Sequence, residues 1–538
     1  MNAIKAHFTN TYNRIFWLIL SAALLLRVVG ICAVPTGVNQ DEAMLAMDAW
    51  ALSKYGTDRY GTYMPVHFEA WKYGQMSVLL AYLMVPFIKV LGFQTLAVRL
   101  PMALVSTLCV GIVYLIGKRL FSEKQALVIM ALTAVNPWHF MQSRWALDCN
   151  LFPHIFLIGL YLLLLGLEKR RYLYLSMVFF GLTFYCYGVA VYTVPVFLVL
   201  YAVWCLWRKQ LKIRHVLVSI LIFLAVALPE ILTMAINMFG WSTIETPLFT
   251  MQYFPESIRS NDILLLNFSW EQLWKNAQSL VNQVFLQKPD WLHNAIPEYG
   301  PLYKMSLPFV VIGMVAFTVR VFRYSGRIEA ARTEKQADFA LWCALLTGIW
   351  TGLVTREVNI NRVNIIFYPL IILCGYGIWT VVGWFEKYRQ VVAGMVLGAY
   401  CVCVTGFFVS YFTEFPQDIQ WYFNRDFLEI TEEADGLEDY DTLYITGHMN
   451  WQYNCQMAEI LTQYSCKIDS HYYQELTNTT GGRALLPYSQ RYHFVDMAYQ
   501  NFADGDALYI LHRSEVAYLP EGYEVVAENG AYVVVRLY

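Results

Sequence analysis

The sequence is poor in charged residues. Only 14% of its 538 residues are Asp, Glu, Lys or Arg, whereas soluble globular chains carry about a quarter. The formal net charge of −2 is close to zero, so we predict no nucleic-acid partner. Tandem repeats and low-complexity tracts are also missing. The sequence has no small-residue cleavage site before Asn39, so we expect the first apolar segment to be a retained helix and not a cleaved signal peptide.

The cysteines and histidines show no spacing typical of a metal site. The 11 Cys are scattered singly, mostly in apolar runs, where small core residues are expected. His139 and His154 are separated by one predicted helix and lack a compact ligand spacing. We therefore predict no metal and no cofactor. Cys455 and Cys466 lie in the polar C-terminal region, where a disulfide between them is an alternative if that region is extracytoplasmic.

Long apolar runs, by contrast, recur along the chain. Hydrophobic residues make up 58% of the sequence, and many runs reach the length of about 20 residues that spans a bilayer. This pattern predicts an all-α polytopic membrane protein with about 11 transmembrane helices, within a range of roughly 11 to 13. The predicted segments are 15–34, 98–117, 125–141, 150–167, 172–187, 191–207, 215–235, 306–322, 338–355, 363–383 and 390–411.

Clusters of Lys and Arg determine the predicted orientation. If segment 98–117 runs from outside to inside, the basic clusters face the cytoplasm, as the positive-inside rule requires: 118–119, 169–171, 208–214, 320–335 and 387–389. The apolar run 76–92 then does not fully cross, or it shares a bent element with the segment that follows. We therefore expect a multi-pass protein of the plasma (cell inner) membrane, with a cytoplasmic N-terminus and an extracytoplasmic C-terminal domain.

The polar segments predict two domains. The transmembrane domain would cover residues 1–411, and a small extracytoplasmic α/β domain would cover 412–538. Two large outer loops are expected, at 35–75 and 236–305. The C-terminal region contains strand-like runs at 442–446, 507–511 and 523–538, separated by predicted helices.

Acidic and basic side chains gather in the predicted outer loops. Asp41 and Glu42 follow the first span, and carboxylates at a membrane helix cost free energy unless they serve a purpose. Other candidates lie in the remaining outer loops and at outer helix ends: Glu69, Lys72, Arg99, Arg144, Asp148, Glu298, Tyr299, Arg356 and Arg362. This set suits a reaction in which an acceptor loses a proton and a phosphate leaving group is stabilised.

Each candidate also has a structural interpretation. Asn39 and Asp41 both suit the N-cap of a following helix, and the helix dipole would favour Glu42 in its first turn. Ion pairs or lipid contacts are the alternatives for several others: Glu69 with Lys72, Arg144 with Asp148, and Arg99 with lipid head groups. Arg356 and Arg362 are alternatives for binding one phosphate.

Eight stretches follow one another over about residues 15–385: VNQDEAMLAMDAWAL, HFEAWKYGQ, FQTLAVRLP, IGKRLFSEKQA, VNPWHFMQSRWALD, GLTFYCYGVAVYTVP, IPEYGPLY and NRVNIIFYPLIILCGYG. Through their order and spacing, the sequence resembles the GT-C fold glycosyltransferases that use polyprenyl-phosphate-linked sugars. By this resemblance it is close to the protein O-mannosyltransferases and the lipid A aminoarabinose transferases. The region from 412 resembles no family that we can name.

The resemblance implies a GT-C fold, a polyprenyl-phosphate-sugar donor and attack at the anomeric carbon with inversion. It assigns the catalytic base to the first-loop Asp, which is Asp41 here. Lys72 or an Arg would bind the lipid phosphate, and the other candidates would bind substrate. The acceptor would be a cell-envelope glycan, lipid or protein. Oligosaccharyltransferases of the same superfold use a divalent cation, for which Asp41, Asp148 and Glu298 are the alternative ligands.

The sequence departs from these relatives after Glu69. Aminoarabinose transferases tend to have a Lys-Pro-Pro run there, whereas this chain has Ala70-Trp71-Lys72, so neither aminoarabinose nor lipid A is implied. Two alternatives to an enzyme stay open. A transporter or flippase of lipid-linked glycans would use charges inside the membrane, for which Arg27 and Glu230 are the main candidates. A non-catalytic membrane scaffold would work through its outer domain.

Overall fold

The chain forms two compact units. The computed structural model describes residues 10–71, 75–255, 268–323, 330–437, 439–450, 452–480, 483–502 and 507–538. The first unit comprises Met1–Val29, Leu100–Leu232 and Arg259–Phe412, and the second comprises Gly30–Arg99, Thr233–Ile258 and Thr413–Tyr538. The second unit thus combines the C-terminal region with two segments that the sequence analysis assigns to the transmembrane domain.

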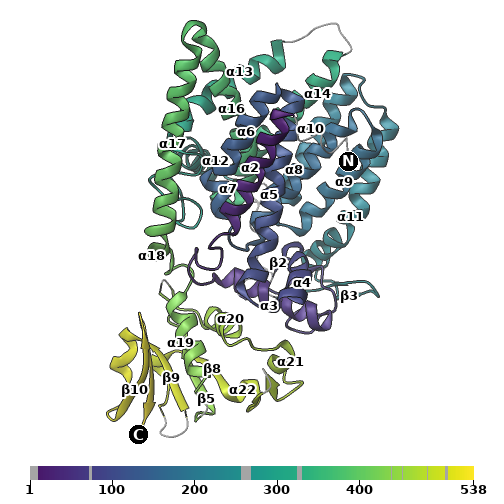
Figure 1. The fold of residues 1–538 in the computed structure, drawn as a ribbon. Helices are drawn as coiled ribbons and strands as arrows, with labels where there is room; N and C mark the ends of the chain where they lie inside the picture. Colours follow the sequence, from purple (N-terminus) through teal and green to yellow (C-terminus); the bar gives the residue numbers. More distant parts are fainter. Residues whose placement is uncertain are drawn as a thin grey trace. The chain divides into compact units, whose positions relative to one another are not determined.

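The first unit is built from helices, several of which are labelled in Figure 1. Two helices continue beyond its ranges by more than one residue: α5 (Thr95–Leu120) begins before Leu100, and α11 (Ile213–Phe239) ends after Leu232. The others are α2 (Thr11–Val28), α6 (Glu123–Val135), α7 (Pro137–Gln142), α8 (Asp148–Gly166), α9 (Arg170–Leu182), α10 (Ala190–Trp207), α12 (Trp270–Leu280), α13 (Leu307–Arg323), α14 (Ala330–Val354), α15 (Ile360–Val363), α16 (Phe367–Trp384) and α17 (Arg389–Thr413).

Nine helices within the described residues are long and apolar enough to cross a membrane, and they match nine of the predicted segments. The mainly helical, polytopic architecture is therefore confirmed. The predicted segments 125–141 and 172–187 are helical but interrupted. Asn136 has an extended backbone and caps α7, whose first residue is Pro137, so that α6 ends at Val135. After α9, a 3-10 turn covers Thr183–Tyr185.

Glycines allow two of the long helices to cross closely. A Cβ atom at Gly313 of α13 would overlap the carbonyl oxygen of Leu373, and one at Gly377 of α16 would overlap that of Phe309. Small residues permit such close backbone approach between membrane helices, where dispersion contacts and not water exclusion favour association. The α13–α16 pair therefore depends on these two positions.

The second unit begins with the chain around the first predicted outer loop. Its elements there are α3 (Gln40–Tyr55), the antiparallel pair β1 (His67–Phe68) and β2 (Met76–Ser77), and α4 (Leu79–Leu91). The segment Thr233–Ile258 adds a second antiparallel pair, β3 (Ile244–Glu245) and β4 (Thr250–Met251). The 13 residues of α4 extend about 20 Å, less than the roughly 30 Å of a hydrocarbon layer. The apolar run 76–92 thus contains a helix too short to cross by itself.

The C-terminal region contains a five-stranded mixed sheet with the order β10-β11-β9-β5-β8. β5 is parallel to both β8 and β9, whereas β11 is antiparallel to β9 and β10. The strands are β5 (Thr442–Thr446), β8 (Tyr492–Val495), β9 (Ala507–His512), β10 (Tyr523–Asn529) and β11 (Tyr532–Leu537). All three predicted strand-like runs are therefore strands, and the run 523–538 is a hairpin.

Helices pack against this sheet, and the pair β6 (Thr479–Thr480) and β7 (Arg483–Ala484) lies outside it. Figure 1 shows α19 and α20 beside the strands. The helices are α18 (Phe415–Ile419), α19 (Arg425–Asp435), α20 (Cys455–Ser465), α21 (Ser470–Tyr473) and α22 (Tyr488–Arg491). Leu508 and Ile510 are fully buried, as are Tyr509 and Leu511 on the opposite face of β9. The sheet is thus covered on both faces, as expected of an α/β domain.

Cys455 and Cys466 are both free thiols. Cys455 begins α20 and Cys466 caps its C-terminal end. The intervening helix separates their Cα atoms by roughly 16 Å, whereas a disulfide requires less than about 7 Å. The alternative of a disulfide between them is therefore wrong.

Candidate active site

Asp41 lies in the first turn of α3. Asn39 caps this helix, because its backbone is extended and its side-chain oxygen accepts the Asp41 N–H at 3.0 Å. The carboxylate of Asp41 is therefore not needed as a cap. It is half-buried, and its Oδ1 accepts a hydrogen bond from the indole Nε1–H of Trp71 at 2.6 Å. The positive end of the helix dipole stabilises negative charge at this position.

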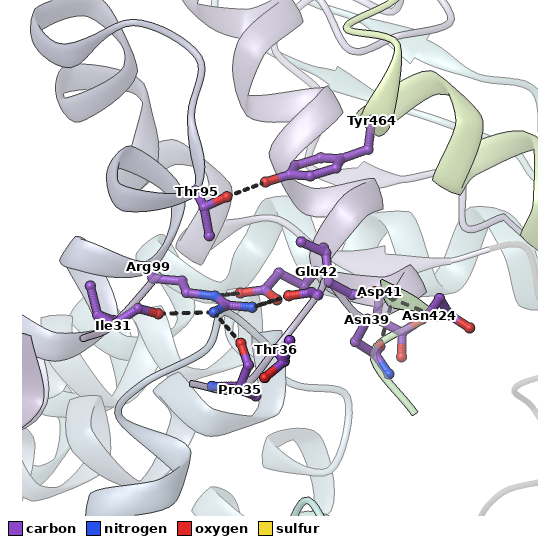
Figure 2. Close-up of polar contacts among 12 residues, drawn as sticks. Ile31, Pro35, Thr36, Asn39, Asp41, Glu42, Thr95, Arg99, Asn424 and Tyr464 are labelled. Carbon is purple, nitrogen blue, oxygen red and sulfur yellow. Dashed lines mark hydrogen bonds and ion pairs between the residues drawn. The ribbon is translucent and has the colours of Figure 1, made fainter. Parts of the chain in front are cut away.

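Glu42 and Arg99 form a buried ion pair in the second unit (Figure 2). Nε and one terminal nitrogen of Arg99 donate to the two carboxylate oxygens of Glu42, both at 2.8 Å, and the two side chains are 0% and 1% exposed. Arg99 also donates to the carbonyl oxygens of Ile31, Pro35 and Gly37 at 2.7–2.9 Å. These contacts hold the irregular chain that leads into α3. Both residues were predicted to bind substrate, and these contacts favour a positioning role.

A second buried ion pair, which the sequence analysis missed, joins Asp48 and Arg59. The carboxylate of Asp48 accepts the backbone N–H of Arg59 at 3.0 Å and its guanidinium at 2.7 Å, and both side chains are buried. Burial raises the pKa of Asp48, and the positive charge of Arg59 opposes this rise. Arg59 also donates to the carbonyl oxygen of Glu69 at 2.9 Å, two residues before Trp71. The sequence feature that could have indicated this pair is Asp48 itself, a carboxylate inside the otherwise apolar run Met44–Leu52.

Arg144 closes the C-terminal end of α2 in the first unit. It is fully buried and donates to the carbonyl oxygens of Leu26, Arg27 and Val29 at 2.8–3.0 Å. The last carbonyls of a helix lack intrahelical partners and attract a cation. The guanidinium also lies 5.3 Å from the ring centre of Phe140. The predicted site residue is thus closely bound to the protein backbone.

Asp148 begins α8, and its Oδ1 accepts the N–H of Cys149 at 2.6 Å. The Nδ2 of Asn364 donates to the carbonyl oxygen of Cys149, also at 2.6 Å. Arg362 lies in α15, where its backbone N–H donates to Oδ1 of Asn359 at 2.8 Å and its guanidinium donates to the carbonyl oxygen of Glu357 at 3.0 Å. Helix α15 contacts α8, so Arg362 and Asp148 lie on neighbouring helices of the first unit.

The remaining predicted site residues differ in their surroundings. Glu298 and Arg356 are exposed. Tyr299 is half-buried, and its ring contacts Phe407 edge-on with ring centres 5.6 Å apart. Lys72 lies outside the described residues. Within the described ranges, no three His, Cys, Asp or Glu side chains are grouped so as to hold a metal ion.

Arg27, a predicted charge inside an apolar run, belongs to a buried polar network of the first unit. Its guanidinium donates to two backbone carbonyls and lies 2.7 Å from Nδ1 of His139. Nε2 of His139 lies 2.9 Å from the hydroxyl of Tyr368, which is 2.5 Å from Nδ1 of His154. The network joins α2, α7, α8 and α16 and satisfies polar groups that would otherwise be costly to bury.

The chain is similar to known proteins in both sequence and structure. The family model described as dolichyl-phosphate-mannose-protein mannosyltransferase matches residues 75–232. The crystal structure of ArnT from Cupriavidus metallidurans bound to undecaprenyl phosphate aligns with a TM-score of 0.61 at 14% identity, covering 96% of this chain and 97% of ArnT. This chain has the GT-C fold. The predicted resemblance to GT-C glycosyltransferases of the protein-mannosyltransferase and ArnT type is thereby confirmed.

Further structures share the GT-C fold with this chain. ArnT in the apo state gives a TM-score of 0.58 at 13% identity, with 96% of this chain and 97% of ArnT covered. The oligosaccharyltransferase AglB from Archaeoglobus fulgidus, in complex with an inhibitory peptide and a dolichol-phosphate, gives 0.51 at 12% identity. That match covers 84% of this chain and 63% of AglB. A search of curated protein sequences finds no significant match.

The candidate residues of this GT-C chain fall into two groups, one in each unit. In the second unit, Asp41, Glu42 and Arg99 lie around the start of α3, and Arg59 links the backbone of Glu69 to the same helix. The first unit holds the others: Arg144, Asp148, Glu298, Tyr299, Arg356 and Arg362. Sequence reasoning missed Trp71, although an indole within the HFEAWKYGQ stretch was visible.

Proposed function

We propose that this chain is an integral-membrane inverting glycosyltransferase that moves a sugar from a polyprenyl phosphate to an acceptor hydroxyl, with Asp41 as general base. The observation that carries the proposal is the half-buried carboxylate of Asp41, held in the first turn of α3 by the indole of Trp71. The mannosyltransferase family match and the ArnT-like fold support the same reaction class.

In the proposed step, the acceptor oxygen attacks the anomeric carbon of the donor sugar. The hydroxyl proton passes to the carboxylate of Asp41 as the new glycosidic bond forms. The bond between the anomeric carbon and the phosphate oxygen breaks, and the polyprenyl phosphate leaves with the electron pair. A single displacement inverts the anomeric configuration. The donor already carries a phosphate leaving group, so the step needs less acid assistance than glycoside hydrolysis does.

The residues around Asp41 would orient it and not react themselves. The hydrogen bond from Trp71 fixes the plane of the carboxylate, so less reorganisation is required when the proton arrives. The buried Glu42–Arg99 pair immobilises the chain before α3. Positive charge would stabilise the departing phosphate. Lys72, Arg356 and Arg362 stay our proposed candidates for that contact. The ammonium group of a lysine binds phosphate as a point charge, and a guanidinium binds it with two parallel hydrogen bonds.

We place the reaction on the extracytoplasmic face of the plasma membrane, with the N-terminus in the cytoplasm. The proposal rests on the distribution of Lys and Arg along the sequence. The acceptor on that face would be a glycan, lipid or protein of the cell envelope. The remaining predicted substrate contacts are Glu69, Arg144, Asp148, Glu298 and Tyr299.

Replacing Asp41 with Asn tests the function directly. The amide keeps the size of the side chain and can accept the Trp71 hydrogen bond, but it cannot take the acceptor proton. Purified protein would be assayed with a panel of synthetic polyprenyl-phosphate hexoses and envelope extracts, scoring release of polyprenyl phosphate. We expect turnover to fall by at least about 100-fold, while binding of undecaprenyl phosphate is retained.

The control is Asp418→Asn, which changes an exposed Asp of the same unit. It should keep wild-type turnover. Wild-type turnover in Asp41→Asn would show that Asp41 is not the base. Absence of turnover in the wild-type protein with every donor, together with movement of lipid-linked sugars across vesicle membranes, would favour a transporter.

A further inference from the structure

The C-terminal region contacts the chain just before α3. The N–H of Val38 donates to the carbonyl oxygen of Phe423 at 2.7 Å, and Nδ2 of Asn39 donates to that of Tyr422 at 3.3 Å. Nδ2 of Asn424 donates back to the carbonyl of Val38 at 3.4 Å. These bonds include Asn39, the N-cap residue of α3, which lies two residues before Asp41.

Gly37 makes this approach possible. Its φ of +86° lies in the region that favours glycine, and a Cβ atom there would overlap the carbonyl oxygen of Phe423. Phe423 is fully buried, and Asn424 has a φ of 49° and is also fully buried. The backbones of the two segments are therefore closely packed, so a shift of residues 422–424 would move the start of α3.

The C-terminal region also holds the other end of α3. Asp469 accepts a hydrogen bond from Lys54 Nζ at 2.6 Å and from the Tyr55 hydroxyl at 2.9 Å. The ring of Tyr55 stacks on His471 with ring centres 3.5 Å apart. Burial raises the pKa of Asp469, but the hydrogen bonds from Lys54, the His471 N–H and Tyr55 outweigh it and hold that pKa below its ordinary value.

Between these two ends, α20 packs along α3. Trp50 of α3 stacks on Phe93 with ring centres 4.5 Å apart, and Phe93 meets the ring of Tyr464 of α20 edge-on at 5.4 Å. The hydroxyl of Tyr464 lies 3.0 Å from that of Thr95 (Figure 2). The C-terminal region thus contacts α3 at its start, along its length and at its end.

We propose that the C-terminal region is a positioning element of the active site, which holds α3 at both ends and thereby fixes Asp41. Asp469 and Tyr422–Asn424 are its positioning residues, and the inference rests on the proposed function of Asp41. The base must lie within hydrogen-bond reach of the acceptor hydroxyl, and an error of about 1 Å can cost about 100-fold in rate.

The test compares Asp469→Ala with Asp441→Ala in the full-length protein. Asp441 is exposed and belongs to the same region. Hydrogen–deuterium exchange of residues 40–55 measures how firmly α3 is held, without reference to catalysis. We expect faster exchange and at least about a tenfold fall in kcat for Asp469→Ala. The donor KM should stay within about twofold, because Asp469 does not touch substrate in this proposal.

Two further variants separate positioning from general destabilisation. Asp469→Glu retains the carboxylate and should recover most of kcat. If Asp469→Ala caused only a general structural defect, restoring the carboxylate would not restore kcat. Tyr55→Phe removes one hydroxyl donor to Asp469 with no change in ring packing, and should show a smaller change of the same kind if Asp469→Ala does not fold.

Unchanged exchange of residues 40–55 in both Asp469→Ala and Tyr55→Phe would overturn the holding contact. Faster exchange with wild-type kcat would overturn its role in positioning Asp41. A failure of the proposed function is distinguishable from both, because wild-type turnover would then be absent or Asp41→Asn would be active, while the exchange measurement still decides whether the contact holds α3.

Discussion

Buried arginines organise irregular backbone throughout this protein. Arg99 donates to three carbonyl oxygens as well as to Glu42, Arg144 donates to three carbonyls at the end of α2, and Arg59 reaches the carbonyl of Glu69. A guanidinium has five donors in a fixed plane, so one side chain can hold several peptide groups of a turn. At the residue scale, these arginines explain how loops beside a membrane helix keep a defined shape.

The Glu42–Arg99 pair predicts a large effect of Glu42→Gln. The substitution would leave the buried charge of Arg99 without its partner, which costs about 3–5 kcal/mol. We expect a clear fall in Tm of the detergent-solubilised protein. Glu429→Gln is the control, because the Arg425–Glu429 pair is 46% and 48% exposed and such pairs contribute roughly 0–1 kcal/mol. Equal Tm values for both variants would contradict the structural role of Glu42.

The sequence identified Glu42 and Arg99 as candidates but not as partners. They are 57 residues apart, and no helical or strand periodicity connects them. Helical spacing was the only basis for an ion pair between Arg144 and Asp148, but the chain from Ser143 to Leu147 is not helical, and Arg144 donates to carbonyls at the end of α2. Local spacing predicts partners only within one regular element. Contacts that depend on tertiary approach were therefore out of reach.

At the scale of elements, the spans were the most predictable part of the fold. Length and hydropathy suffice for a helix that must satisfy all its backbone hydrogen bonds in lipid. The interrupted runs 125–141 and 172–187 show the limit, because hydropathy does not register a cap residue such as Asn136. The tight α13–α16 crossing was equally invisible, since it depends on where two glycines meet.

This crossing predicts that Gly377→Ala destabilises the protein. The added methyl group would overlap the carbonyl oxygen of Phe309, so the helices would have to separate. Overpacking of this kind costs about 1–3 kcal/mol, and we expect a lower Tm and a lower yield of monodisperse protein. Gly383→Ala is a matched control on the same helix, because no atom lies within 4 Å of its added Cβ. An equal or higher Tm for Gly377→Ala would show that α13 and α16 do not pack this closely.

At the scale of the whole molecule, the orientation that the basic clusters predict is open to a direct test. We predict that alkaline phosphatase fused after Tyr538 is active, because this reporter folds only outside the cytoplasm. Green fluorescent protein fused after Lys209 should fluoresce, because that loop carries a basic cluster on the predicted cytoplasmic side. Fluorescence after Tyr538 together with phosphatase activity after Lys209 would reverse the orientation.

The composition of the second unit could not be predicted from the sequence. A composition change near residue 412 suggested a separate C-terminal domain, and the three predicted strand-like runs are strands, whereas β8 was not predicted. That Gly30–Arg99 joins the same compact unit depends on contacts such as Val38–Phe423 and Tyr55–Asp469, between segments almost 400 residues apart or more. Neither composition nor periodicity carries information over such distances.

The three-segment composition of the second unit also constrains how the protein is made. A ribosome completes Arg99 and then synthesises the long helical stretch before Thr413, which takes about 16 to 60 seconds at roughly 5–20 residues per second. During that interval the nascent chain has α3 without Asp469 or Phe423. The surface of α3 that contacts α20 and residues 422–424 is covered only when the last part of the chain has been made. Assembly of the candidate base is therefore a late, post-insertion event, and an mRNA truncated before the C-terminal strands would yield a membrane-embedded protein that lacks a finished site.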